Sequence, residues 1–260
     1  MRTTLIDDYA RAMGRTPDGL RLVRGEHADV VLDDDTGLAW RFPRYGAPVE
    51  PLAERVRLVR AHGLPAPEVL LVRADCLVTR LLPGAPLSER TPVDPDALAA
   101  LLTALASVPH DDAASWRGST SWRAEWQTLA SEVRHRVAPL LSPEAGRRAL
   151  AEVTAAAETA ASAPAGFVHG DLGGANVLIE NGRVSGVLDW DEAGPGDPAV
   201  DFAALSVSSP EPVRRRLAVR FPDLAERARA YAATFALQEA VHGLLHDEPE
   251  AVEAGLSSYR

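Results

Sequence analysis

Lysine is missing from this sequence: all 27 basic residues are arginines, against 37 aspartates and glutamates. Cysteine occurs once, at Cys76, which excludes an intramolecular disulfide and a cysteine-based zinc cage. No apolar run approaches the ~20 residues of a membrane-spanning helix, so we expect no contact with a membrane. The first eight residues lack the apolar core of a secretory signal peptide, which predicts a cytoplasmic location.

The composition is that of a folded, globular protein. The 260 residues are 46% hydrophobic and 25% charged, enough to build one large domain or two lobes around a sizeable core. The formal net charge of −10 argues against general nucleic-acid binding, which needs a basic surface. It suits a cationic small-molecule ligand, but also plain solubility, because a net charge does not say where the charges lie.

A tight hairpin is predicted inside the stretch 167–201. Two short apolar runs, 177–179 and 187–188, lie on either side of Asn181-Gly182, a dipeptide that strongly favours a two-residue turn. The loop 169–176 precedes this hairpin, so residues before and after it are expected to meet.

Three polar side chains are thereby brought towards one point. Asp171 and Asn176 lie on the loop, and Asp189 leaves the far end of the hairpin. Carboxylate and amide oxygens suit Mg²⁺, which usually takes one or two carboxylates together with substrate phosphates. A chance motif beside an unrelated hairpin with structural carboxylates is the alternative.

The spacing H-x-D-x-x-x-x-N, from His169 to Asn176, is that of the catalytic loop of eukaryotic-type kinases. Leu188-Asp189-Trp190 stands where those kinases have Asp-Phe-Gly, and the run Asp197 to Ala203 follows at the expected distance. Together these features resemble the aminoglycoside phosphotransferase and choline kinase group of small-molecule kinases.

The resemblance implies a role for each residue of this stretch. Asp171 would be the catalytic residue that accepts the proton of a substrate hydroxyl, and Asn176 and Asp189 would hold Mg²⁺ against the phosphates of ATP or GTP. His169 would orient the loop rather than act as an acid or base. The loop would be braced by Asp197 and Asp201.

The implied fold is α+β and bilobal, like that of protein kinases. Residues 1–82 would form a nucleotide-clamping lobe around a small antiparallel sheet, and residues 83–260 a mostly helical lobe for catalysis and substrate binding. Strands are predicted at 20–23, 29–32, 38–42, 69–72 and 76–79. Helices are predicted at 4–12, 51–61, 94–109, 122–137, 143–161, 202–206, 211–218, 222–245 and 248–259.

The third strand should carry a cation for the nucleotide phosphates. The family usually places lysine there, and Arg41 is the candidate here because it shares a strand face with Ala39 and Pro43. A guanidinium binds phosphate oxygens bidentately, so the replacement is chemically sensible without being equivalent. An ordinary surface arginine is the alternative.

The partner of this cation is harder to find. In the family a glutamate on the helix 51–61 pairs with it, but Arg55 occupies the natural position in the apolar stripe. Glu54, one residue away, is the candidate; an exposed helix-surface glutamate, or another partner for Arg41, is the alternative.

The nucleotide base is assigned by position only. Residues Arg80, Leu81 and Leu82 leave the sheet where the family hydrogen-bonds adenine through its backbone. The turn at Gly25 would cover the phosphates, although an ordinary hairpin explains it as well.

Acidic residues near the cleft are expected to bind a cationic substrate. Glu239, near the C-terminal end, and Asp191 and Glu192, after the metal-binding aspartate, are the candidates, with solvated positions as the alternative. The tryptophans at 116, 122 and 126 are interpreted as packing residues rather than ligand platforms.

The predicted function is that of an antibiotic O-phosphotransferase conferring resistance. The acceptor would be a small, cationic antibiotic: an aminoglycoside, a tuberactinomycin peptide such as viomycin or capreomycin, or a macrolide. A kinase of choline, a sugar or an amino-alcohol, and a catalytically silent nucleotide-binding module, are the alternatives. The oligomeric state is left open.

Overall fold

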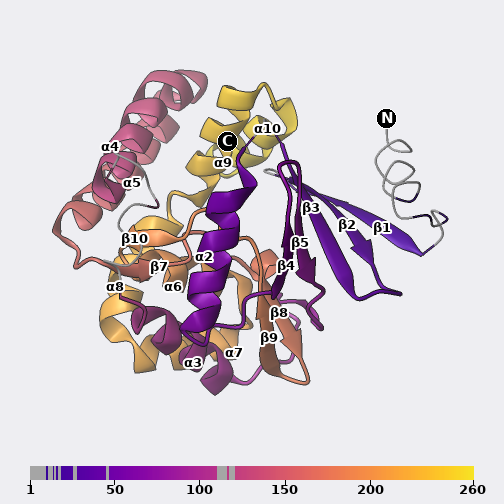
Figure 1. Ribbon diagram of the computed structural model, residues 1–260. Coiled ribbons are helices and arrows are strands. Elements are labelled where there is room, and N and C mark those ends of the chain that lie inside the picture. Colours follow the sequence, from indigo (N-terminus) through magenta and orange to yellow (C-terminus); the bar gives the residue numbers. More distant parts are fainter. Residues whose placement is uncertain are drawn as a thin grey trace.

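The computed structural model describes residues 10, 14, 16, 19–25, 28–44, 47–109, 116 and 121–260 (Figure 1). Apart from Ala10, the helix predicted for residues 4–12 lies outside this part of the chain.

Within these ranges the N-terminal part forms a five-stranded antiparallel sheet in the spatial order β1-β2-β3-β5-β4. Its strands are β1 (Leu20–Arg24), β2 (Ala28–Asp33), β3 (Leu38–Pro43), β4 (Val69–Val72) and β5 (Leu77–Arg80). One face carries a small apolar cluster that contains Val31, Trp40, Cys76 and Val78. Because side chains alternate along a strand, the burial of Trp40 turns its neighbour Arg41 to the opposite face.

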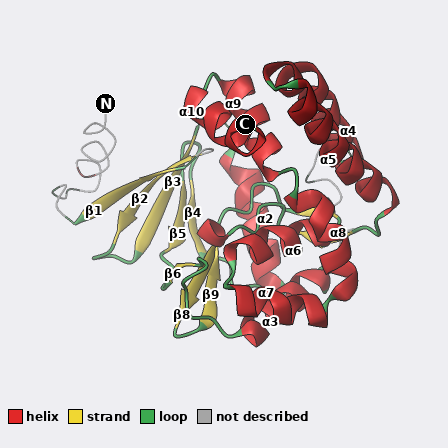
Figure 2. Ribbon diagram, turned by 180° about the vertical axis from the view of Figure 1, so that it is seen from behind, coloured by secondary structure: helices red, strands yellow, loops and turns green. Residues whose placement is uncertain are grey.

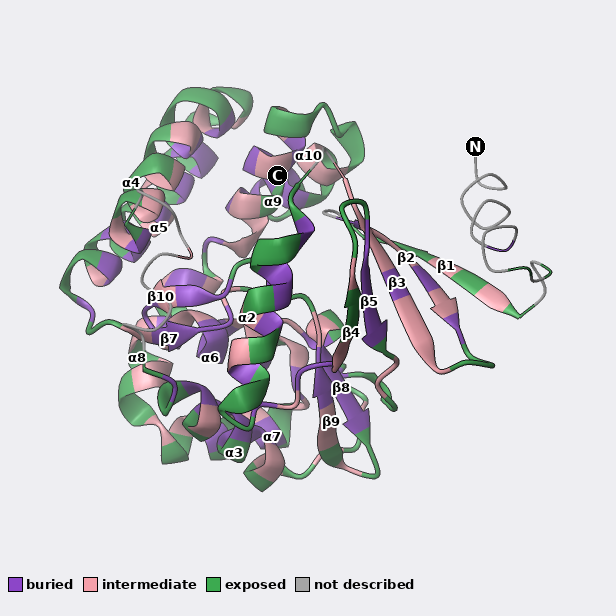
Figure 3. Cartoon of the chain, viewed as in Figure 1, coloured by how far each residue is buried: buried purple, intermediate pink, exposed green. Residues whose placement is uncertain are grey.

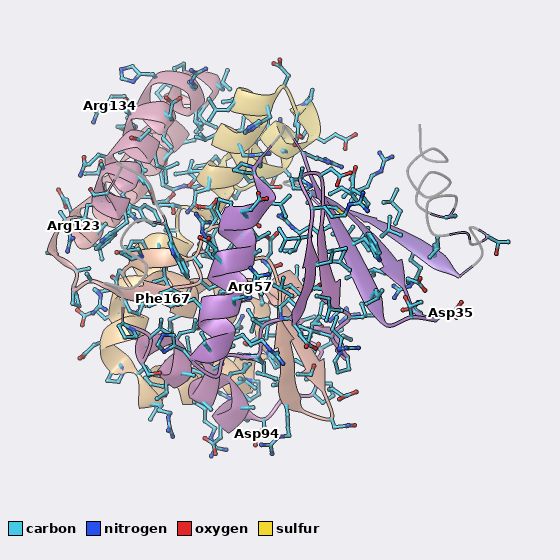
Figure 4. All side chains as sticks on the ribbon, viewed as in Figure 1. Asp35, Arg57, Asp94, Arg123, Arg134 and Phe167 are labelled. Atoms are coloured by element: carbon cyan, nitrogen blue, oxygen red, sulfur yellow. The ribbon has the colours of Figure 1, made fainter. Side chains whose placement is uncertain are left out.

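Helix α2 (Val49–Ala61) connects β3 to β4. Its apolar side chains repeat at helical spacing, and the buried set is Val49, Leu52, Ala53, Val56 and Val59. Figure 3 shows this helix buried along one side and exposed along the other, and Figure 4 shows its exposed Arg57. The buried side joins a large apolar cluster built mainly from the C-terminal part of the chain, so α2 ties the sheet to the helices.

The next helices begin at side chains that cap their first turn. Asp94 accepts a hydrogen bond from the Asp96 amide at the start of α3 (Pro95–Ala106), as expected for an N-cap followed by proline (Figure 4). Ser121 and Ser142 likewise cap α4 (Trp122–Glu132) and α5 (Pro143–Ser162). The helix predicted for 122–137 is continuous but changes at Val133 to a π-helical turn, Val133–Val137, followed by a 3₁₀ turn, Ala138–Leu140.

The segment that contains Asp171, Asn176 and Asp189 is built around a series of short strands. β7 (Gly166–Val168) pairs with β10 (Gly194–Gly196), and β8 (Val177–Glu180) pairs with β9 (Arg183–Val187) and β6 (Ala85–Pro86). A 3₁₀ turn, Gly174–Asn176, leads into β8. The predicted hairpin is confirmed: Asn181 and Gly182 join β8 to β9 with φ of 52° and 77°. Both values lie in the left-handed region that this two-residue turn needs.

The C-terminal helices lie beside the sheet and are seen from behind in Figure 2. They are α6 (Ala199–Ser208), α7 (Glu211–Arg220), α8 (Pro222–Ala232), α9 (Phe235–His246) and α10 (Pro249–Leu256), followed by a 3₁₀ turn, Ser257–Tyr259.

The prediction of one helix over 222–245 is wrong, because α8 ends at Ala232 and α9 begins at Phe235. Thr234 is fully buried at this break. Its hydroxyl donates to the Tyr231 carbonyl and accepts from the Gln238 side chain. A threonine that bonds back to the preceding turn competes with helix continuation.

The architecture agrees with the predicted α+β kinase-like fold, with an antiparallel sheet region and a helical C-terminal region. In the described part of the chain, no helix is long and apolar enough to cross a membrane.

Candidate active site

The loop after β7 is held by a carboxylate from α6. The side chain of Asp201 accepts the His169 amide at 2.7 Å and the Gly170 amide at 2.9 Å. Gly170 has φ of +90°, and a Cβ there would lie 2.5 Å from the Glu192 carbonyl oxygen, so both conformation and space require glycine. Asp201 therefore braces this loop from the first turn of a helix.

His169 is fully buried, and both of its ring nitrogens are hydrogen-bonded to the backbone. Its Nε2 lies 2.8 Å from the Leu188 carbonyl oxygen, which can only accept, so Nε2 carries the proton and Nδ1 accepts from the Asp171 amide at 3.2 Å. Burial lowers the pKa of His169 below its ordinary value, against the opposite effect of the Asp201 carboxylate. A neutral imidazole thus links the Asp171 loop to the segment that leads into Asp189.

Asp171 and Asn176 are in direct contact. The Asn176 Nδ2 donates to the Asp171 carbonyl oxygen at 2.9 Å and to its Oδ2 at 2.8 Å. The main-chain carbonyl oxygen of Asn176 accepts a hydrogen bond from the Leu188 amide at 2.8 Å. Asp171 is exposed. The spacing therefore does bring the Asp171 loop beside the residue that precedes Asp189.

Asp189 lies opposite Arg41 across the site. Its φ of 57° is left-handed for a residue with a side chain, and such strained positions gather at functional sites. Its Oδ1 is 3.6 Å from the Arg41 Nη2, while the Oδ2 of Asp191 is only 2.6 Å from the same nitrogen. Arg41 thus reaches from β3 to the aspartates that follow the hairpin.

The residues around Asp189 fit a magnesium ion delivered with a nucleotide. The Asn176 Nδ2 is bonded to Asp171, which leaves the side-chain oxygen of Asn176 as a ligand of the kind that Mg²⁺ takes, as is the Asp189 carboxylate. The described residues contain no cluster of three or more acidic, histidine or cysteine side chains suited to a metal. An all-protein metal cage is therefore not found there, whereas one carboxylate and one amide oxygen agree with an ion that phosphates also ligate.

The structure does not pair Glu54 with Arg41. Glu54 is exposed on α2, and the carboxylates found near Arg41 in the described part of the chain are Asp189 and Asp191. Arg55, the neighbour of Glu54, donates instead to the carbonyl oxygens of Asp191 and Trp116. Its position in the apolar stripe was the available signal that it faces the interior.

Residues 80–82, which are expected to bind the nucleotide base, already use two of their backbone amides in hydrogen bonds within the protein. The Arg80 amide donates to the Glu68 carbonyl oxygen and the Leu81 amide to that of Gly37. The Arg80 guanidinium also pairs with the Glu68 carboxylate at 3.0 Å. Leu82 packs closely against Gly186. A base at this segment would have to use its other backbone groups.

A cavity of about 1080 Å³ opens beside Asp171. Of the predicted substrate residues, Glu192 and Glu239 line it, whereas Asp191 is paired with Arg41. Three further acidic residues, Glu125, Asp197 and Glu248, line the same cavity, so its carboxylates outnumber its two arginines, Arg24 and Arg44.

Glu125 was missed by the sequence analysis. It sits between Trp122 and Trp126 on α4, and all three side chains line the cavity. Positions i, i+3 and i+4 share a helix face, so this face could have been recognised from its spacing. The tryptophans also pack inside the protein: Trp122 is buried, and the Trp126 ring lies 4.7 Å from the Tyr231 ring.

A kinase-like fold in which Asp171 and Asn176 are in contact, with Asp189 just beyond the hairpin that follows them, is that of a phosphotransferase acting on small molecules. Residues 20–239 match the model of the Phosphotransferase enzyme family, and the chain belongs to this family. It is an enzyme that transfers phosphate to a hydroxyl group.

A curated relative is the viomycin phosphotransferase of Streptomyces vinaceus, 33% identical over 274 aligned positions that cover 95% of this chain and 94% of the relative. Two solved structures share the fold. A GDP complex of aminoglycoside 2′-phosphotransferase-IIIa superposes with a TM-score of 0.80 at 17% identity, covering 99% and 97% of the two chains. Macrolide 2′-phosphotransferase MphH from Brachybacterium faecium gives 0.71 at 22% identity, covering 97% and 96%.

Proposed function

We propose that this enzyme transfers the γ-phosphate of ATP or GTP to a hydroxyl of a cationic antibiotic, and that a tuberactinomycin peptide such as viomycin is the first candidate. The observation that carries the proposal is the acidic cavity beside Asp171, because carboxylates in a cleft concentrate positive ligands. The relation to a viomycin phosphotransferase over nearly the whole chain favours the peptide over the other cationic classes.

Asp171 is proposed as the catalytic residue. Its exposed carboxylate faces the cavity and would accept the proton of the substrate hydroxyl while orienting it towards the γ-phosphate. Asn176 holds that carboxylate in place through its Nδ2. The protein supplies little covalent chemistry, since phosphoryl transfer depends on positioning the reactants and on neutralising the charge of the phosphates.

The nucleotide is proposed to lie between the sheet and the helical part, with residues 1–82 as its clamp and residues 83–260 as the catalytic lobe. Asn176 and Asp189 would hold Mg²⁺, which when bound neutralises phosphate charge. Arg41 would contact the phosphates as a planar, permanently charged group. A donor nucleotide also agrees with the predicted cytoplasmic location.

The test is to incubate the protein with Mg²⁺, ATP or GTP and a panel of viomycin, capreomycin, aminoglycosides and macrolides. We expect viomycin or capreomycin to gain one phosphoryl group by mass spectrometry. Asp171→Asn should lower kcat by roughly 10²- to 10⁴-fold, the usual contribution of general acid–base catalysis. Nucleotide affinity should stay close to that of the wild type, because Asn keeps the size of the side chain.

Other outcomes would change the assignment. Phosphorylation of choline, a sugar or an amino-alcohol without that of any antibiotic would make the protein a metabolite kinase. Nucleotide binding without transfer to any acceptor would favour the silent module. Turnover that survives Asp171→Asn would contradict the role of Asp171.

A further inference from the structure

Arg41 has its shortest ion pair with a residue from a distant part of the chain. Its Nη2 donates to the Oδ2 of Asp191 at 2.6 Å, across 150 residues of sequence. Both side chains are largely shielded, with 16% and 27% of their surface exposed. A charge-assisted hydrogen bond in such a setting is screened less than one at the surface and fixes the guanidinium more firmly.

Helix α2, which the structure describes from end to end, offers no carboxylate for this purpose. Its two acidic residues, Glu50 and Glu54, are both exposed. Arg55, next to Glu54, is the charged residue of α2 that points inward, and its charge is opposite to that of a glutamate. An arginine on β3 and another on α2 would repel each other, so an anion or a polar acceptor must lie between them.

Asp191 supplies both acceptors. Its carboxylate accepts from Arg41, and its main-chain carbonyl accepts from Arg55. The second guanidinium nitrogen of Arg55 donates to the Trp116 carbonyl at 2.6 Å, which ties α2 to the C-terminal part. One aspartate therefore joins β3, α2 and the turn after Asp189.

We propose that Asp191 is the positioning residue for Arg41, and that it orients this arginine towards the nucleotide phosphates. The inference rests on the proposed function, because it assumes that Arg41 meets a nucleotide. Asp189 lies farther from Arg41, at 3.6 Å, and is the residue proposed to hold Mg²⁺. An arginine has five N–H donors, so one carboxylate leaves others for phosphate oxygens. Asp191 is thus assigned to the nucleotide and not to the antibiotic.

The test measures nucleotide affinity directly, by calorimetry with Mg²⁺ and a non-hydrolysable ATP or GTP analogue. Asp191→Asn should weaken binding by roughly tenfold, the size expected for residues coupled in one network. The carbonyl bound by Arg55 is unchanged in this variant, and its Tm should confirm that it folds. Asp34→Asn is the matched control, because it removes the carboxylate of an exposed Arg21–Asp34 pair in the same sheet and should leave affinity unchanged.

A double-mutant cycle separates positioning from substrate binding. If Asp191 acts through Arg41, Arg41→Met with Asp191→Asn should bind nucleotide no more weakly than Arg41→Met alone. Asp191→Glu should restore part of the affinity, and KM for the antibiotic should not change in Asp191→Asn.

Three results would overturn the inference while leaving the proposed function intact. They are nucleotide affinity in Asp191→Asn equal to that of the wild type, additive losses with a raised KM for the antibiotic, and tighter nucleotide binding in Asp191→Asn, since Asp191 would then compete with the phosphates. A wild-type protein that binds no nucleotide would overturn the proposed function and this inference with it.

Discussion

His169 is a buried side chain that connects the Asp171 loop to the segment before Asp189. Its ring lies 4.6 Å from the ring of Trp190 and bonds to the backbone on both sides. Protonation would place a proton on Nδ1, which now accepts the Asp171 amide, so the charged form cannot keep this arrangement. These contacts suit a neutral residue that holds the loop.

The burial of His169 predicts a pH dependence of stability. Its pKa is lower in the folded than in the unfolded state, so the unfolded chain binds the proton more readily. The stability linked to His169 is complete above the unfolded pKa of about 6.5 and is lost as the pH falls below it, with a slope of at most about 1.4 kcal/mol per pH unit. Urea unfolding at a series of pH values from about 7 to 5 measures this slope.

Aspartates and glutamates also bind protons as the pH falls, so the contribution of His169 has to be isolated by comparing variants with the wild type. His169→Gln should be less stable at neutral pH but should lose less stability on acidification than the wild type. His135→Gln, at an exposed histidine, should retain the wild-type slope. Equal slopes in His169→Gln and the wild type would contradict the assignment.

At the level of elements, the β8–β9 hairpin sets the distance between the two halves of the site. β8 begins directly after Asn176, and β9 ends two residues before Asp189. Pairing starts at the two-residue turn with Glu180 opposite Arg183, and a bulge between Leu178 and Ile179 shifts the register before Val177 pairs with Val187. A slip of one residue would turn every side chain to the other face. The turn residues therefore affect the relative placement of Asn176 and Asp189, the pair proposed to hold Mg²⁺, although they lie away from it.

The turn can be tested at Gly182. A Cβ there would meet only the Asp94 amide nitrogen, at an ordinary 3.9 Å, so the cost of Gly182→Ala comes from the φ of +77°. We expect a loss of about 1–2 kcal/mol in the free energy of unfolding, the usual penalty for a left-handed L-residue. Gly182→Asn should lose less, because asparagine tolerates this conformation. Equal losses for both variants would show that space, not conformation, sets the cost.

At the scale of the whole molecule, the sheet and the helices are packed by separate apolar clusters. The sheet has a small apolar cluster of its own, whereas α2 packs with the C-terminal helices. The net charge of −10 does not say where the charges lie. The structure shows that four glutamates, from α4 to the start of α10, line the cavity beside Asp171.

This charge predicts how substrate binding responds to mutation and salt. Glu239→Gln should raise KM for a cationic antibiotic about 10-fold or more, in line with the loss of a hydrogen bond to a charged group. KM for the nucleotide should stay the same. Rising ionic strength should raise KM for the antibiotic less in this variant than in the wild type, because less charge remains to be screened.

Steady-state kinetics at low and high salt make this measurement. Glu158→Gln, on the exposed surface of α5, removes the same charge away from the cavity and should behave like the wild type. If both variants had the same effect, net charge rather than the cavity would govern binding.

The sequence alone determined most of the local structure around the site. Asn181-Gly182 specified the hairpin, Asp94 and Pro95 the start of α3, and the spacing from His169 to Asn176 the contact of Asp171 with Asn176. These features depend on residues that are neighbours in the chain, so backbone preferences and short loops suffice to fix them.

The tertiary structure decided which distant residues meet. Only packing turned Arg55 rather than Glu54 inward, moved Asp191 from the expected substrate cleft to Arg41, and divided the helix at Thr234. The lining of the cavity by Glu125 likewise depends on how α4 lies against α9. Such contacts depend on the relative placement of whole elements, because partners as far apart as Arg41 and Asp191 leave no spacing in the sequence for a pattern to reveal.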